Sequence, residues 1–241
     1  MKIKILYEDS NILAIDKPSG ISVHPDGRSK EKTITDWVLE NYPKMKNVGE
    51  PMFLETKGKK IEIKRPGVVH RLDRDTSGVL ILTKNQKAYD FLKIQFQNRE
   101  IKKTYNAIVN GWLKEDRGVI TKPIGRSPND FRKYSASRGA RGEMREAITR
   151  YKVIKRWGIG LRKFTYLELF PKTGRTHQIR VHMKAIDHPV VCDPLYNPKG
   201  PYPKEIKRMA LHAVSIEFKD LKDKIIKIES VLPLQFKKFL K

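Results

Sequence analysis

The sequence predicts an α+β fold built on a mixed, mostly antiparallel sheet. Segments with the alternation of strands outnumber segments with helical spacing, and several neighbouring strands are joined by hairpin-like turns. This order differs from the repeated strand–helix alternation of a doubly wound parallel sheet. No internal repeat and no flexible Gly/Ser linker divides the 241 residues. We therefore expect a single domain over residues 1–241, built as two lobes of one continuous sheet.

The first half of the chain begins with a predicted hairpin. Apolar and basic side chains alternate over residues 2–5, and a turn at 8–11 leads into a second apolar run. Thr33 is a candidate N-cap for the first helix, which Pro43 would end. The expected elements are strands at 3–5 and 12–15, a helix over 33–41, a strand at 79–82 and a helix over 85–98.

The second half of the chain is richer in strands. Two long strands are expected to pair around the glycines at 158–160. Gly174 suggests a close backbone approach before the next helix, and Thr176 is able to cap that helix. The expected elements are strands at 104–109, 147–157, 164–170, 211–218 and 224–231, and helices over 176–187 and 233–240.

Two stretches lack a clear period, and we interpret both as loops. Residues 44–66 are rich in Lys, Gly and Pro, with room for one short strand at 60–64. Residues 125–145 are dense in Arg and interrupted by Gly and Ser. Long loops inside compact domains are often functional.

The charge balance indicates a polyanionic partner. The chain has 51 Lys and Arg against 27 Asp and Glu, a formal net charge of +24, while 39% of its residues are hydrophobic. That apolar content is too high for a disordered basic tail, so the charge must lie on a folded surface that attracts nucleic acid. There is no apolar run of membrane-spanning length and no signal peptide. We expect a soluble, cytoplasmic protein without a membrane partner.

Several chemistries are excluded by the motifs that the sequence lacks. It has no Gly-rich dinucleotide fingerprint, no phosphate-binding P-loop and no HExxH zinc motif. Cys192 is its single cysteine, which excludes a disulfide framework and a cysteine-based zinc finger. We therefore expect neither a metal nor a cofactor.

The segment HRLDRDTSG at residues 70–78 is the most unusual in the chain. Asp73 and Asp75 lie among basic residues and run directly into an apolar strand. Nearby guanidinium groups favour the ionised carboxylate, which can act as a nucleophile or base. The competing interpretation is an exposed turn with local ion pairs, each worth under about 1 kcal/mol.

Two further segments could carry chemistry. The sequence TGRTHQIRVH at 173–182 places Arg175 and Arg180 around an expected helix N-terminus, which suits a phosphate or a carboxylate from elsewhere in the chain. The alternative is an amphipathic helix with solvated arginines. Tyr105, in KKTYNAIV, lies on a predicted strand, where packing is the more common role of a tyrosine.

Together these segments resemble the signature blocks of the RluA-type pseudouridine synthases. The blocks are HRLDRDTSGVLILTKN, KKTYNAIVNG and PKTGRTHQIRVHMKAIDHPVVCDPLY, and the opening ILYEDSNILAIDKPSGISVHP is similar to the start of that family's catalytic domain. The resemblance spans about residues 5 to 231. It implies a single catalytic domain over 1–241, with a mixed, mostly antiparallel sheet in two lobes and a central active-site cleft.

The resemblance also implies roles for individual residues. Asp73 matches the family's catalytic aspartate, Tyr105 the tyrosine that packs against the target base, and Arg180 the arginine that pairs with the aspartate. Arg71 matches the residue that takes the place of the flipped base in relatives. RNA contacts are further expected from His70, Arg74, Arg175, His177, Arg132, Lys133, Arg138 and Arg141.

The activity that the resemblance implies is isomerisation of uridine to pseudouridine in structured RNA. Ribosomal RNA is the first expected substrate and tRNA the second; we expect no DNA partner and a monomeric protein. Many relatives carry an S4-type RNA-binding domain before the catalytic domain; because the resemblance starts by residue 5, we expect no such domain here. Two alternatives stay open: a non-catalytic RNA-binding or ribosome-assembly protein, and a nucleoside hydrolase, for which +24 is an excessive charge.

Overall fold

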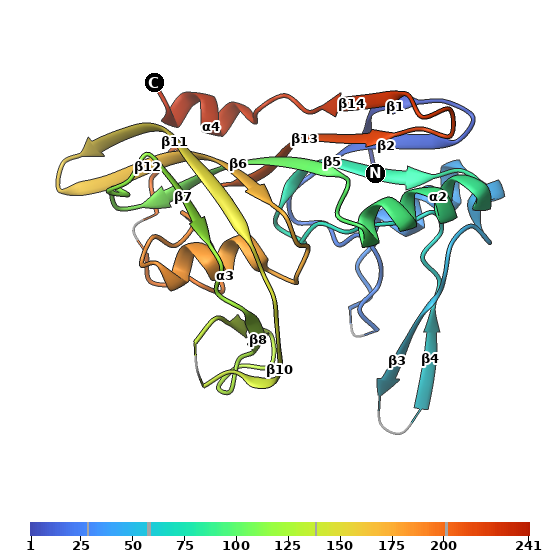
Figure 1. The fold of residues 1–241 in the computed structure, drawn as a ribbon, viewed down its shortest axis with the longest axis horizontal. Coiled ribbons are helices and arrows are strands. Elements are labelled where there is room, and N and C mark those ends of the chain that lie inside the picture. The colour runs from blue at the N-terminus through green and yellow to red at the C-terminus, as the bar shows by residue number, and fades with distance from the viewer. Residues whose placement is uncertain (28, 57–58, 138, 201) are drawn as a thin grey trace. The chain divides into compact units, whose positions relative to one another are not determined.

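The computed structural model describes residues 1–27, 29–56, 59–137, 139–200 and 202–241, which fall into two compact units. The first unit comprises Met1–Ile101 and Ser215–Ser230, and the second comprises Lys102–Val214 and Val231–Lys241. Figure 1 shows the elements of both units. Strand β13 (Leu211–Lys219) contributes its first four residues to the second unit and its last five to the first.

The first unit is a sheet covered by helices. The expected hairpin is present as antiparallel strands β1 (Lys4–Glu8) and β2 (Ile12–Lys17), and β2 pairs with β5 (Ser77–Thr83). Strand β14 (Ile225–Glu229) pairs with the end of β13. Helix α2 (Gln86–Gln97) packs Leu92 against Val79 and Ile81 of β5.

The first helix begins where the sequence predicts. Helix α1 (Ile34–Asn41) is capped by Thr33, whose hydroxyl accepts the N–H of Asp36 while the Asp36 carboxylate accepts the N–H of Thr33. This reciprocal capping box satisfies two donors that a helix start otherwise leaves unpaired. A 3₁₀ turn (Pro43–Met45) follows the helix.

The expected loop at 44–66 is wrong in its second half, where the chain forms a hairpin. Strands β3 (Met52–Thr56) and β4 (Lys59–Ile63) pair antiparallel, with Phe53 opposite Glu62. Lys60 places its ammonium 4.5 Å from the Phe53 ring centre. Strand β4 lies within one residue of the short strand expected at 60–64. Strand β3 was missed because exposed charged side chains mask the alternation on which strand prediction depends.

The second unit contains a four-stranded antiparallel arrangement in the order β6 (Lys102–Asn110), β12 (Arg162–Pro171), β11 (Thr149–Ile159), β7 (Arg117–Ile120). The predicted hairpin around 158–160 is confirmed as β11 and β12. Helices α3 (Gln178–Ala185) and α4 (Leu234–Phe239) lie on opposite sides of these strands (Figure 1). Both contribute to one core, α3 through Met183 and α4 through Phe236.

The basic stretch at 125–145 is not the loop that the sequence suggests. It forms most of a small sheet in the order β10 (Arg141–Arg145), β8 (Ile124–Arg126), β9 (Tyr134–Ser135). Ile124 and Ala147 bury a small core of their own against Val181 and Tyr196. The strands are two to five residues long, too short for their periodicity to be detected.

Candidate active site

In the first unit, the segment that carries Asp73 is fixed by its main chain. The Asp73 carbonyl accepts the N–H of Thr76 at 3.1 Å, which closes a turn. The Arg74 carbonyl accepts the N–H of Gly20 at 2.8 Å, and the Asp75 carbonyl accepts the hydroxyl of Ser19 at 2.6 Å. Because three successive carbonyls accept hydrogen bonds, the half-buried Asp73 side chain extends from a fixed backbone.

Lys17 at the end of β2 is the anchor of this segment. Its side chain is fully buried, and its ammonium donates to the carbonyls of Pro18, Ile21 and Arg74 at 2.7–3.0 Å. Lys17 is not among the site residues predicted from the sequence. In the structure, its bond to the Arg74 carbonyl ties the 70–78 segment to the end of β2.

We expect Lys17→Met to lower the free energy of unfolding by about 2–4 kcal/mol, because it removes three hydrogen bonds from a fully buried position and leaves the carbonyls of Pro18 and Ile21 without their lysine donor. The same change should lower turnover, since the 70–78 segment loses the hydrogen bond from Lys17 to the Arg74 carbonyl. Urea unfolding and single-turnover kinetics measure the two effects. The control is Lys87→Met on the exposed face of α2, expected within about 0.5 kcal/mol of the parent. Equal stability and turnover in both variants would contradict the role of Lys17.

The basic residues around Asp73 each have a defined partner. Arg71 donates to Nε2 of His24 at 3.1 Å, and burial lowers the pKa of His24 to about 4, so this imidazole is neutral at pH 7 and accepts that bond. The exposed Arg74 binds both carboxylate oxygens of Glu31 at 2.9 and 3.1 Å. His70 accepts the N–H of Ile81 in β5 at 2.9 Å and stacks on Phe96.

In the second unit, Tyr105 and Arg180 come from different elements. Tyr105 lies on β6 opposite Leu169 of β12 and packs against the core. On the same strand, burial lowers the pKa of the half-buried Lys103. Arg180 lies on α3, and its side chain is only 3% exposed.

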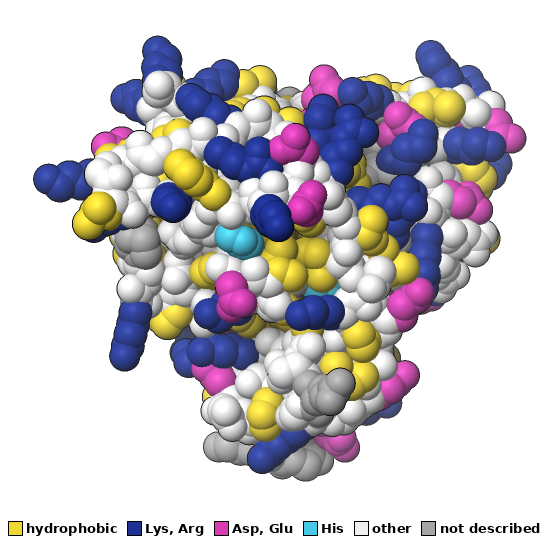
Figure 2. All heavy atoms as spheres, turned by 60° about the vertical axis from the view of Figure 1, so that its left-hand side comes forward, with side chains coloured by type: hydrophobic (Ala, Val, Ile, Leu, Met, Phe, Trp, Pro, Cys, Tyr) yellow, Lys and Arg dark blue, Asp and Glu magenta, His cyan; other side chains and the backbone are white. Residues whose placement is uncertain are grey.

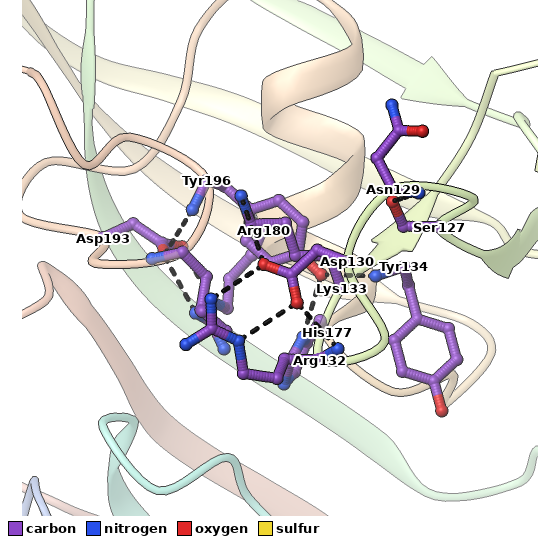
Figure 3. Close-up of polar contacts among 11 residues, drawn as sticks. Ser127, Asn129, Asp130, Arg132, Lys133, Tyr134, His177, Arg180, Asp193 and Tyr196 are labelled. Carbon is purple, nitrogen blue, oxygen red and sulfur yellow. Dashed lines mark hydrogen bonds and ion pairs between the residues drawn. The ribbon is translucent and has the colours of Figure 1, made fainter.

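Arg180 forms a buried ion pair with Asp193. Its Nε and Nη2 donate to the two carboxylate oxygens at 2.7 and 2.8 Å, and the Asp193 side chain is fully buried (Figure 3). The backbone N–H groups of Leu195 and Tyr196 donate to the same carboxylate at 2.9 and 3.0 Å. Asp193 was not predicted, although it is the lone carboxylate in the apolar run 189–196, and a carboxylate buried there needs a charged or hydrogen-bonding partner.

Tyr196 connects this ion pair to the start of α3. Its ring centre is 5.0 Å from the Arg180 guanidinium carbon, and its hydroxyl lies 2.8 Å from Nδ1 of His177. The same hydroxyl accepts the N–H of Tyr134 at 2.9 Å. His177 occupies the N-cap of α3 with a φ of 56°, a conformation that costs a non-glycine residue energy and that surrounding contacts must hold in place.

The start of α3 corrects two expectations. The helix begins at Gln178, and the cap is His177 rather than Thr176, with no side-chain cap bond. Gly174 does not have a positive φ, and a Cβ there would sit 3.8 Å from the nearest heavy atom, so no close approach requires glycine. Instead, the Gln178 amide oxygen accepts from Thr173 and from the N–H of Arg175, which fixes the turn.

The expected RNA-binding residues of the stretch at 125–145 are exposed or half-buried where the structure describes them. Arg132 makes two bonds to Asp130 at 2.9 and 3.0 Å, with 62% of its side chain exposed, and Lys133 lies 3.7 Å from the same carboxylate. Arg141 begins β10 and is exposed. Arg138 lies outside the described residues.

The described part of the chain offers neither a metal site nor a membrane-spanning helix. It holds no group of three or more His, Cys, Asp or Glu residues arranged to bind a metal ion. None of its helices has the length and apolar character needed to cross a membrane.

Comparison with known proteins gives these residues a context. Residues 11–185 match the family model described as RNA pseudouridylate synthase. The chain belongs to this family. The pseudouridine synthases are isomerases, and the membership predicted from the HRLDRDTSG and GRTHQIRVH blocks is confirmed.

Individual relatives support the same conclusion. The synthase is 34% identical over 239 residues to an uncharacterized RNA pseudouridine synthase of Synechocystis sp., and 37% identical over 239 residues to the ribosomal large subunit pseudouridine synthase D of Borreliella burgdorferi. In both cases the match covers 99% of this chain and 68% of the relative, so the chain spans about two thirds of their length.

A solved structure confirms the α+β fold with its mostly antiparallel sheet. The human RNA pseudouridylate synthase domain containing 1 superposes with a TM-score of 0.75 at 24% identity. The match covers 96% of this chain and 84% of the human one.

Proposed function

We propose that this synthase isomerises uridines in structured RNA, that ribosomal RNA is its substrate and that residues 1–241 act as one catalytic domain. The observation that carries the proposal is the main-chain clamp that holds the Asp73 segment in a fixed conformation. The name of the Borreliella burgdorferi relative supports ribosomal RNA. Transfer RNA is the second candidate.

The reaction needs no external group. The bond between the uracil nitrogen and the ribose breaks, and the base turns. A bond between a uracil carbon and the ribose then replaces it, so every atom of the nucleotide is retained. An ionised carboxylate supplies a nucleophile or a base for these steps, and we propose Asp73 for that role. Tyr105 would pack against the uracil, and Arg180, held by Asp193, would place its positive charge near an anionic group at the reaction centre.

The target base must leave the stack before it can react. Flipping a nucleotide out costs a few kcal/mol, which contacts to the phosphates must offset. Figure 2 shows Lys and Arg side chains spread across one face of the synthase, interleaved with apolar ones. Arg71, an exposed guanidinium held by the neutral His24, is suited to take the place of the flipped base.

The basic stretch at 125–145 is proposed to bind phosphates. Replacing four of its residues with serine should flatten the slope of log affinity against log salt by roughly 0.7–0.9 unit for each lost contact, up to about four contacts. Single-turnover chemistry at saturating RNA should change far less. The substitutions are Arg132→Ser, Lys133→Ser, Arg138→Ser and Arg141→Ser.

The control for this variant removes the same charge elsewhere, at exposed positions. Filter binding of a ribosomal RNA transcript over a salt series measures both proteins. A slope equal to that of the control would show that the basic stretch at 125–145 is a solvated surface that does not bind RNA phosphates. Residues 44–66 would then be the next candidate for phosphate binding. The control substitutions are Lys222→Ser, Lys224→Ser, Lys237→Ser and Lys238→Ser.

The proposed activity is tested directly by carbodiimide labelling. Purified synthase is incubated with unmodified ribosomal RNA and tRNA transcripts, and pseudouridines are then located by primer extension. New stops in ribosomal RNA are expected. RNA binding without any new pseudouridine would favour a non-catalytic RNA-binding protein. Stops confined to tRNA would identify tRNA, rather than ribosomal RNA, as the substrate.

A further inference from the structure

The second unit contains a cavity of about 200 Å³ beside α3. It is lined by two tyrosines, two serines and two lysines, among other residues: Tyr134, Tyr196, Ser135, Ser137, Lys122 and Lys184. We propose that this cavity holds the base of a second, unstacked nucleotide of the RNA substrate, with the adjoining phosphates at the two lysines. The inference rests on the proposed function and adds a specificity site to it.

The size and the lining of the cavity suit one nucleobase. Its volume is below the roughly 300–1,000 Å³ of sites that enclose a drug-sized ligand, so it accommodates part of a nucleotide. Val181 supplies an apolar wall and the two tyrosines supply aromatic ones, on which bases of any sequence can pack. The hydroxyls of Ser135 and Ser137, 2.8 Å apart, can each donate or accept at a base edge.

The charge at the cavity rim suits the phosphates of the same nucleotide. Lys122 and Lys184 are both exposed, and Lys122 donates to the Ala185 carbonyl at 2.8 Å. That bond places an ammonium at the C-terminus of α3, where the partial negative charge of the helix end would otherwise repel a phosphate. Phosphate binding by such lysines contributes affinity and salt dependence.

One wall of the cavity also supports the catalytic arginine. Tyr196 lines the cavity, donates its backbone N–H to Asp193 and lies under the Arg180 guanidinium (Figure 3). Its hydroxyl also accepts the N–H of Tyr134, the other aromatic wall. A base in the cavity would therefore restrain the residues that hold Arg180, so the RNA sequence beside the target uridine would affect both binding and turnover.

The direct test fills the cavity with Ala185→Trp, since Ala185 is half-buried and lines it. The matched control is Leu161→Trp, which adds the same ring at a fully exposed turn of the same unit. With a ribosomal RNA transcript as the probe, we expect Ala185→Trp to raise KM roughly tenfold to hundredfold. The control should leave KM unchanged.

A crosslinking readout identifies where the RNA lies. Transcripts partly substituted with 4-thiouridine are irradiated with each protein, and the crosslinked peptides are found by mass spectrometry. A crosslink to the peptide that contains Tyr134 is expected in the parent and in Leu161→Trp, and its loss is expected in Ala185→Trp. An unchanged KM together with a persistent crosslink in Ala185→Trp would overturn the inference.

A second pair of variants keeps the test valid if Ala185→Trp fails to fold. Lys122→Gln/Lys184→Gln should flatten the salt dependence of binding by about one to two units relative to Lys237→Gln/Lys238→Gln. Equal slopes would contradict the phosphate assignment. Failure of the proposed function gives a different result: the parent forms no pseudouridine, while the crosslink still decides whether RNA occupies the cavity.

Discussion

Asp73→Asn is expected to abolish isomerisation, lowering kcat by about 10⁴-fold or more while RNA affinity stays within a few-fold of the parent. The amide is nearly isosteric with the carboxylate but is a far weaker nucleophile and base. The backbone contacts of the segment involve carbonyls that the substitution leaves in place, so the fold should be retained. Pseudouridine formation in a single turnover, measured beside equilibrium binding, separates the two effects.

The neighbouring carboxylate provides the matched control. Asp75→Asn removes the same charge two residues away, on a segment held by the same clamp, and should retain activity within a few-fold. A reversed result, with Asp75→Asn inactive and Asp73→Asn active, would move the catalytic role to Asp75. Substantial turnover in both variants would contradict a mechanism in which either carboxylate acts as nucleophile or base.

Arg180→Ala is expected to destabilise the second unit and to cripple catalysis together. It leaves the fully buried Asp193 carboxylate without its guanidinium, and breaking a buried ion pair in this way typically costs about 3–5 kcal/mol. Arg180→Lys should recover little, because an ammonium cannot bind both carboxylate oxygens in one plane. Urea unfolding measures the loss of stability, and single-turnover kinetics below the unfolding transition measures the loss of activity.

An exposed ion pair of the same chemistry serves as the control. Arg132→Ala breaks two similar bonds to Asp130, but 62% of the Arg132 side chain is exposed, so the loss of stability should be far smaller than for Arg180→Ala. If Arg180→Ala is no less stable than Arg132→Ala, the buried pair does not organise the unit. If it is unstable but fully active where folded, Arg180 is structural only.

The sequence predicts most elements of this fold because its local signals are strong. The Thr33 cap, the apolar strand at 79–82 and the hairpin around 158–160 each combine a period with a start or stop residue, and each is confirmed. The two stretches interpreted as loops lack such signals. Their strands are short or exposed, so no apolar face repeats often enough to mark them.

The candidate site divides in a similar way. Asp73, Tyr105 and Arg180 were found through contiguous motifs, and their catalytic roles remain predictions. Their supporting residues were not found, since a supporting contact joins residues distant in sequence. Lys17 reaches the carbonyl of Arg74 across 57 positions. Arg180 was expected to pair with Asp73, and the partner that the structure shows for its Nε and Nη2 is Asp193.

The clamp on residues 73–75 separates the shape of the segment from the identity of its side chains. Ser19, Gly20 and Lys17 donate hydrogen bonds to main-chain carbonyl oxygens, which every amino acid possesses. A different residue can therefore be installed at position 73 and still project from the same backbone. This makes the segment a ready platform for chemical rescue, in which Asp73→Ala opens a small space and added formate supplies the missing carboxylate.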